Sequence, residues 1–313
     1  MGTAGTARSP RALLTGWFTF LHGEVTAGDE LALRRVQEVL DRAGIPYDTA
    51  WSPGFRPDAL HLEDAAPERY SHVVFLCGPL HGSQVAALHE RYPHCVRVAV
   101  GVSVPDPGDA AVTGFHRVLA RDAPGTAPAA DLAAAAPGTP AVPVAGVVLT
   151  HGQGEYGPRR RHEEVARRVT GWLAGADCAR LELDTRLARG DWRLCGTPAQ
   201  LQSVLARLDV VVTDRLHGLV LALRAGVPAL AVDPVAGGAK VTAQARVHRW
   251  PALIPAERLT EEELDRWWRW CLGPGRAAAR RRRALQRRHG RDGYDRADEV
   301  VAALRAAPTG TSG

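Results

Sequence analysis

Residues 213–218, Thr-Asp-Arg-Leu-His-Gly, combine side chains suited to binding an anion and moving a proton. Arg215 carries a planar fork of donors that matches a phosphate or a carboxylate. His217 belongs to the one residue type that ordinarily changes charge near neutral pH. Gly218 has no side chain and lets a ligand or another part of the backbone approach closely. The segment therefore predicts an anion site with a proton donor beside it.

The neighbouring residues predict that this segment joins a strand to a helix. The apolar run 208–213 (LDVVVT) is typical of a strand buried on both faces. The spacing of one helix face then recurs at Leu216, Leu219, Val220 and Leu223. Free amide groups and the helix dipole at such a turn favour an anion. The alternative is structural: Asp214 caps the helix, Arg215 is exposed and His217 packs against the sheet.

Short apolar runs alternate with amphipathic stretches along most of the chain. Strands are predicted at 12–17, 72–78, 95–100, 144–150, 179–184, 208–213 and 227–233. Helices are predicted at 29–43 and 160–174, and helix starts at Thr197 and Thr260. This alternation predicts an α/β fold, with parallel sheets that are covered by helices on both faces.

Residues 123–143 are rich in alanine, proline and glycine and predict a linker, because structureless loops of this length are uncommon inside a compact domain. The linker separates a first half at 1–122 from a second half at 144–260, which is followed by helices at 261–313. We expect two doubly wound, Rossmann-like halves that face each other across a cleft, with ligands outside the carboxyl ends of the strands. The alternative is one sheet with a long surface loop.

The net charge of +5 comes from one segment. Residues 276–291 hold eight arginines and no acidic residue, so the rest of the chain is net negative. A charge run on one late helix, with no aromatic residues between the arginines, argues against nucleic-acid binding. It is typical of a solvated face or of a face that contacts a membrane surface. No apolar stretch reaches the roughly 20 residues of a membrane span.

The cysteines lie at positions 77, 95, 178, 195 and 271 and form no C-x-x-C pair. Their odd number and scattered spacing predict reduced thiols in a cytoplasmic protein. The same spacing excludes the usual thiolate zinc site, and the histidines lack the spacing of metal ligands. We therefore expect neither a metal nor another cofactor.

The chain resembles the polysaccharide pyruvyl transferases in three segments that follow one another in order. The most specific runs from Thr213 through an apolar helix and the stretch AGVPALAVD (225–233) to Lys240. Residues 115–122 (FHRVLARD) are similar to the family's mid-chain strand that ends in Arg-Asp. Residues 26–30 (TAGDE) are similar to its Gly-Asp turn near the N-terminus.

The resemblance implies a fold similar to that of the GT-B glycosyltransferases. It also implies an activity, the transfer of the enolpyruvyl group of phosphoenolpyruvate to hydroxyls of a glycan or glycan precursor, usually as a cyclic ketal. On this interpretation Arg215 and Lys240 hold the donor, and Arg121 from the first half closes on the same anion. Thr213 and Gly218 complete the donor-binding turn.

The chemistry of this transfer suits the same side chains. Phosphoenolpyruvate carries a phosphate and a carboxylate, so the site must offset about three negative charges. A proton must reach the methylene carbon, and His217 is the candidate general acid. The base for the attacking hydroxyl is expected in the first half, at Asp29 or Glu24. Asp29 is also suited to the N-cap of a helix.

The loop 151–157 (HGQGEYG) follows the strand predicted at 144–150 and is rich in groups that can bond to sugar hydroxyls. The residues expected to contact the acceptor are His22, Glu24, His151, Glu155 and Tyr156.

Two other functions are open. A GT-B glycosyltransferase would hold the diphosphate of a nucleotide sugar at the same turn, and a larger thermal shift with a nucleotide than with phosphoenolpyruvate would favour it. A non-catalytic anion-binding homologue would bind the donor but release no phosphate with any acceptor.

Overall fold

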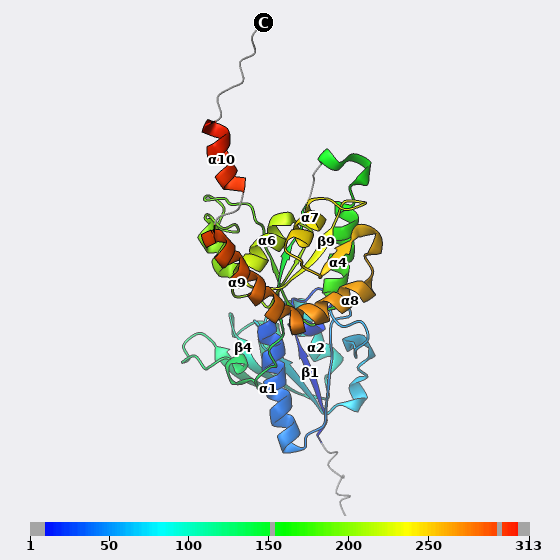
Figure 1. The fold of residues 1–313 in the computed structure, drawn as a ribbon. Coiled ribbons are helices and arrows are strands. Elements are labelled where there is room, and N and C mark those ends of the chain that lie inside the picture. Colours follow the sequence, from blue (N-terminus) through cyan, green and yellow to red (C-terminus); the bar gives the residue numbers. More distant parts are fainter. Residues whose placement is uncertain (1–9, 151–153, 293–295, 306–313) are drawn as a thin grey trace, which may run out of the picture. The chain divides into compact units, whose positions relative to one another are not determined.

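The structure is a computed structural model that describes residues 10–150, 154–292 and 296–305. The chain divides into two compact units, Met1–Thr139 and Pro140–Gly313. Within the described residues each unit has one five-stranded sheet, and all pairs of strands in the two sheets are parallel (Figure 1). The predicted α/β architecture with two Rossmann-like halves is therefore confirmed.

The sheet of the first unit consists of β1 (Ala12–Gly16), β2 (Tyr47–Thr49), β3 (His72–Leu76), β4 (Val96–Ser103) and β5 (Arg117–Asp122). Its helices are α1 (Ala27–Ala43), α2 (Gly82–Arg91) and α3 (Ala110–Thr113), with short 3-10 turns η1 (Trp17–Thr19), η2 (Leu62–Asp64), η3 (Pro67–Arg69) and η4 (Leu132–Ala135). The strand order is β2-β1-β3-β4-β5, a doubly wound order that reverses between β1 and β3.

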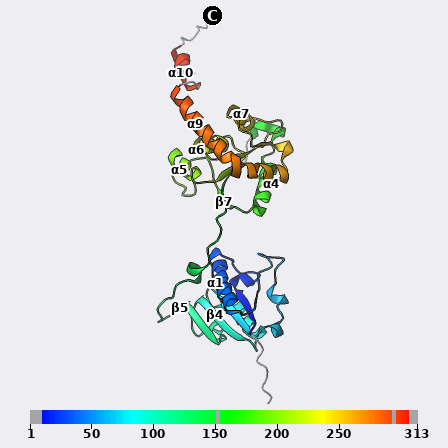
Figure 2. The same cartoon turned by 60° about the horizontal axis from the view of Figure 1, so that its bottom comes forward.

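The sheet of the second unit consists of β6 (Val144–Val148), β7 (Ala179–Glu182), β8 (Val210–Thr213), β9 (Ala229–Asp233) and β10 (Leu253–Pro255). Its helices are α4 (His162–Gly175), α5 (Pro198–Leu205), α6 (Leu216–Ala225), α7 (Lys240–Val247), α8 (Glu261–Trp270), α9 (Arg276–Asp292) and α10 (Arg296–Arg305), with short turns η5 (Gly154–Arg159), η6 (Ala256–Arg258) and η7 (Cys271–Gly275) (Figure 2). The strand order β10-β9-β8-β6-β7 is the same doubly wound order, which here reverses between β6 and β8.

The predicted strands are present. Six of them are one or two residues shorter than the apolar runs, whereas β4 begins one residue later than its run and extends three residues beyond it, to Ser103. All four residues of β8 are buried, as expected for a strand with apolar side chains on both faces. The sequence did not predict β2 and β10, because three residues are too few to show a hydrophobic period.

Helix α1 begins two residues before the predicted start at Asp29. Its N-cap is Thr26, whose Oγ1 accepts a hydrogen bond from the Asp29 amide at 3.2 Å. The Asp29 carboxylate in turn accepts one from the Thr26 amide at 3.1 Å. The alternative in which Asp29 is the N-cap is therefore wrong, since Asp29 is the third helical residue of a capping box.

Part of the segment predicted as a linker packs onto the first unit. The turn η4 lies against α1, and the Leu132 side chain covers Gly101, where an added Cβ would come within 2.8 Å of Leu132 Cδ1. The Ala129 amide also donates to the Arg121 carbonyl at 2.7 Å. The division between the two units falls at Thr139 and Pro140.

Three arginines of α9 hold this helix to its own unit. Arg276 Nη2 pairs with Asp209 Oδ1 at 2.8 Å, and the guanidinium groups of Arg282 and Arg283 donate to backbone carbonyls. Arg280 and Arg281 are exposed. None of the helices described is long and apolar enough to cross a membrane.

Candidate functional site

The turn after β8 lies at the topological switch point of the second sheet. Strands β6 and β8 are neighbours there, and their carboxyl ends carry Thr150 and Asp214. The Thr150 amide donates to Asp214 Oδ1 at 2.8 Å, which ties the two strand ends together. Ligands of doubly wound sheets bind at this position, so the topology selects the same turn as the residue types do.

Asp214 is a functional candidate that the sequence interpretation did not select. Its side chain is buried, with 1% of its surface exposed, and burial raises its pKa to about 7. Within the described residues, Asp214 Oδ2 and Thr150 Oγ1 are buried without a hydrogen-bond partner. Asp214 does not cap α6, so that part of the structural alternative is wrong.

The N-terminus of α6 is open to a ligand. Its N-cap residue is Arg215, and no side chain of the described residues caps the helix. The first amides of a helix have no acceptor within the helix, so those of Leu216, His217 and Gly218 are donors for an anion. His217 is exposed, so the alternative in which it packs against the sheet is wrong as well.

Thr213 and Gly218 pack against each other and fix the backbone of this turn. Thr213 is fully buried, and its hydroxyl donates to the Val148 carbonyl at 2.8 Å and accepts from the Arg215 amide at 3.0 Å. An added Cβ at Gly218 would come within 2.1 Å of Thr213 Oγ1. The glycine is thus needed for the helix to approach the end of β8, and the threonine orients the backbone of Arg215.

The side chain of Arg215 is held by a carboxylate that the sequence interpretation missed. Arg215 Nη1 lies 2.8 Å from Asp184 Oδ1, and about a fifth of each side chain is exposed. Asp184 follows the edge strand β7 and also accepts from Arg186 Nε at 2.6 Å. Burial alone would raise the pKa of Asp184, but hydrogen bonds from Arg186 and the charges of both arginines hold it below its usual range.

A second group of predicted residues meets at the carboxyl end of β9. Lys240 is the first residue of α7, and its Nζ lies 4.0 Å from Glu155 Oε1 and 5.5 Å from the centre of the Tyr156 ring. Tyr156 stacks on His162, a buried histidine whose pKa is lowered by burial and by the charges of nearby cations. Lys240, predicted for the donor, thus lies beside two residues predicted for the acceptor.

Asp233 organises the loop that carries Lys240. Its buried carboxylate accepts from the amides of Val235, Ala239 and Thr242, at 3.1, 2.7 and 2.8 Å. These bonds occupy backbone donors at the start of α7, so this end of the helix differs from the open end of α6. The side chain of Lys240 is what this loop offers to an anion.

The predicted residues of the first unit lie near the carboxyl ends of its strands. Arg121, near the end of β5, donates to Asp122, Asp131 and Ser103 at distances of 2.8, 2.7 and 2.7 Å. The carboxylate of Asp29 serves the capping box of α1. His22 and Glu24, the other predicted residues of the first unit, are exposed. His151, which belongs to the second unit, lies outside the described residues.

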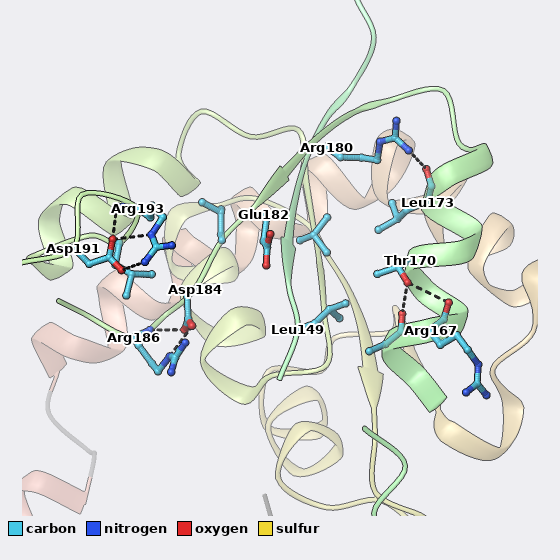
Figure 3. Close-up of a pocket in the computed structure, with 14 residues that line it drawn as sticks. Leu149, Arg167, Thr170, Leu173, Arg180, Glu182, Asp184, Arg186, Asp191 and Arg193 are labelled. Carbon is cyan, nitrogen blue, oxygen red and sulfur yellow. Dashed lines mark hydrogen bonds and ion pairs between the residues drawn. The ribbon is translucent and has the colours of Figure 1, made fainter. Parts of the chain in front are cut away.

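A cavity of about 910 Å³ opens along β7 in the second unit. Apolar side chains, Leu149 and Leu173 among them, line it together with charged ones such as Arg180, Glu182 and Asp184 (Figure 3). Asp184 belongs to both the cavity and the ion pair with Arg215. The cavity therefore adjoins the side chain that is predicted to hold the donor.

Residues 180–234 match a family model described as polysaccharide pyruvyl transferase. The resemblance predicted from the Arg-Leu-His-Gly turn is thus confirmed over this segment, which contains Asp184, Asp214 and Arg215 and ends before Lys240. A search of curated proteins found no significant match.

Among solved structures, the calicheamicin glycosyltransferase CalG4 is 16% identical, with 96% of this chain and 100% of that chain covered and a TM-score of 0.34. The E. coli heptosyltransferase WaaC with ADP is 17% identical, with 86% and 99% covered and a TM-score of 0.27. MurG of Acinetobacter baumannii is 13% identical, with 90% and 95% covered and a TM-score of 0.30.

Proposed function

We propose that the protein is a cytoplasmic transferase that moves the enolpyruvyl group of phosphoenolpyruvate to hydroxyls of a glycan or glycan precursor, as a ketal. The observation that carries this proposal is the turn after β8. An open helix N-terminus, Arg215 and His217 stand together there, inside the segment that matches the polysaccharide pyruvyl transferases. The five cysteines, all free thiols, support a reducing compartment.

The donor would be held by groups of opposite charge. Its phosphate fits the amides at the start of α6 and the guanidinium of Arg215. Lys240, which follows the neighbouring strand β9, is a second cation from the same edge of the sheet. Arg121 of the first unit is the third cation that we propose for binding the donor. Together they would offset the roughly three negative charges of the donor before any bond changes.

In the proposed reaction His217 donates a proton to the methylene carbon, and the central carbon becomes cation-like. A sugar hydroxyl oxygen bonds to that carbon, the bond from the carbon to the phosphate oxygen breaks, and phosphate leaves. A second hydroxyl then closes the ketal. One hydroxyl proton restores His217 and the other leaves with the phosphate, through Asp29 or Glu24 as base. The proposed acceptor contacts are His22, Glu24, His151, Glu155 and Tyr156.

Calorimetric titration of phosphoenolpyruvate tests the donor site without knowledge of the acceptor. Arg215→Ala removes charge-assisted hydrogen bonds worth about 1.5–3 kcal/mol, so we expect the affinity to fall about 30-fold. Its melting temperature should change little, because the ion pair with Asp184 is partly exposed. His217→Ala should keep the binding. A nucleotide sugar that binds more tightly than phosphoenolpyruvate would contradict the proposal and favour a glycosyltransferase.

The arginines of α9 predict contact with an anionic membrane surface. The side chains of Arg282 and Arg283 donate hydrogen bonds to backbone carbonyls of their own unit. The exposed pair Arg280 and Arg281 therefore gives the cleaner test. Sedimentation with vesicles rich in phosphatidylserine should show binding that weakens as salt rises. Replacing Arg280 and Arg281 by glutamine should lower the binding about tenfold or more, since each arginine contributes about 1 kcal/mol near such a surface. Equal binding by the double variant would exclude this contact.

A further inference from the structure

Asp184 is placed to compete with any anion that Arg215 binds. Its Oδ1 accepts from Arg215 Nη1 at 2.8 Å and from the Arg186 amide at 2.8 Å, and its Oδ2 accepts from Arg186 Nε at 2.6 Å. The carboxylate holds one nitrogen of the Arg215 guanidinium, Nη1, by a charge-assisted hydrogen bond of the kind that a phosphate or carboxylate ligand would form. Its own hold on the chain does not depend on Arg215, because Arg186 supplies two of the three bonds.

The surroundings leave room for this ion pair to open. Asp184 lines the cavity of about 910 Å³ along β7 (Figure 3), so its side chain borders open space. Asp184 and Arg215 follow different strands, β7 and β8, which are separated in the sheet by β6. The pair is therefore a contact between side chains of two loops, and one of them can turn away without any change in the sheet.

We propose that Asp184 is an internal counter-ion of Arg215 that an anionic ligand displaces, and that this residue sets the affinity of the anion site. The inference rests on the proposed function, because it assumes that Arg215 binds the anionic donor. Without a ligand, the carboxylate holds the guanidinium in place and neutralises it. When a ligand binds, its phosphate replaces the Asp184 carboxylate on the Arg215 guanidinium, and Asp184 keeps its two hydrogen bonds from Arg186.

The electrostatics predict the direction of the effect. A ligand must replace one ion pair of Arg215 by another, and its negative charge also approaches the negative charge of Asp184. Both effects weaken anion binding. Asparagine at this position keeps an oxygen that can accept from Arg215 and Arg186 but carries no charge. Asp184→Asn should therefore bind anions more tightly than the wild type, whereas damage to a structural contact would weaken binding.

The test is calorimetric titration of inorganic phosphate and of phosphoenolpyruvate into the full chain. We expect Asp184→Asn to bind each anion about tenfold more tightly, since the pair is partly screened by solvent. Asp191→Asn is a matched control, because Asp191 accepts from the amide and the guanidinium of Arg193 in the same Asp-x-Arg arrangement. Among the described residues, Asp191 pairs with Arg193 and forms no hydrogen bond or ion pair with Arg215, so its variant should bind as the wild type does.

The outcomes separate this inference from the proposed function. Phosphoenolpyruvate binding that is equal in wild type and Asp184→Asn, or weaker in the variant, overturns the inference and leaves the donor proposal standing. If phosphate binds, with a tenfold higher affinity in the variant, but phosphoenolpyruvate does not, the inference is supported and the proposal that phosphoenolpyruvate is the donor is overturned. If neither anion binds either protein, both are overturned. Asp184→Glu, which restores the charge, should return the affinity to within about threefold of the wild type.

Discussion

His217→Gln is expected to slow pyruvyl transfer about a thousandfold while phosphoenolpyruvate still binds. A positioned general acid typically contributes a factor of ~10²–10⁴ to the rate. Glutamine keeps a hydrogen-bond donor but cannot release a proton to the methylene carbon. His217 is exposed at the start of α6, so the change should cost little stability. The measurement is phosphate release from phosphoenolpyruvate, with an acceptor that the wild type uses in a screen of glycans.

The control for this prediction is His248→Gln. His248 is the C-cap of α7, at the end of the helix opposite to Lys240, and its Nδ1 lies 3.3 Å from Nε2 of Gln286. It has no part in the proposed site. Its variant should release phosphate at the rate of the wild type. If His217→Gln keeps more than about a tenth of the wild-type rate, the proton comes from another group. If it binds no phosphoenolpyruvate, the histidine serves binding instead.

The sequence predicted the turn after β8 because its signals are local. The run of buried valines, the short connection and the helical spacing after residue 216 all lie within 20 positions of one another. Its partners could not be predicted in the same way. Asp184 reaches Arg215 only because β7 and β8 both lie beside β6, and hydrophobic period predicts strands but not their order in the sheet.

The same limit applies to burial. Asp214 and Asp29 are both aspartates near the start of a helix, and both were suited to an N-cap. In the structure Asp214 is buried at the switch point and accepts a hydrogen bond from the Thr150 amide. Asp29 forms a capping box with Thr26. The first role depends on how β6 and β8 lie side by side. The second was missed because the usual partner in a capping box is glutamate or glutamine.

Asp214→Asn is expected to change how stability depends on pH. Burial raises the pKa of Asp214 to about 7 from an ordinary value of 3.8, so the folded protein binds this proton more tightly than the unfolded chain. The resulting stabilisation is complete below pH ~4 and is lost as pH rises through about 7. The difference between the pKa of Asp214 in the folded protein, about 7, and its ordinary value of 3.8 corresponds to about 4 kcal/mol in the free energy of unfolding. Asparagine does not titrate, so its variant lacks this contribution to the pH dependence.

Urea unfolding between pH 4 and 8, followed by tryptophan fluorescence, measures this effect in the unit concerned, because six of the eight tryptophans lie in the second unit. The free energy of unfolding of Asp214→Asn minus that of the wild type should increase by about 4 kcal/mol across this range. Taking the difference removes the titration of all other carboxylates. Asp191 is a partly exposed carboxylate whose pKa is lowered by hydrogen bonds from Arg193, so it is already ionised over most of this range, and Asp191→Asn should show no such increase. A difference that is constant with pH for Asp214→Asn would mean that the buried carboxyl is already charged in the folded protein, with its charge offset by the groups at the start of α6.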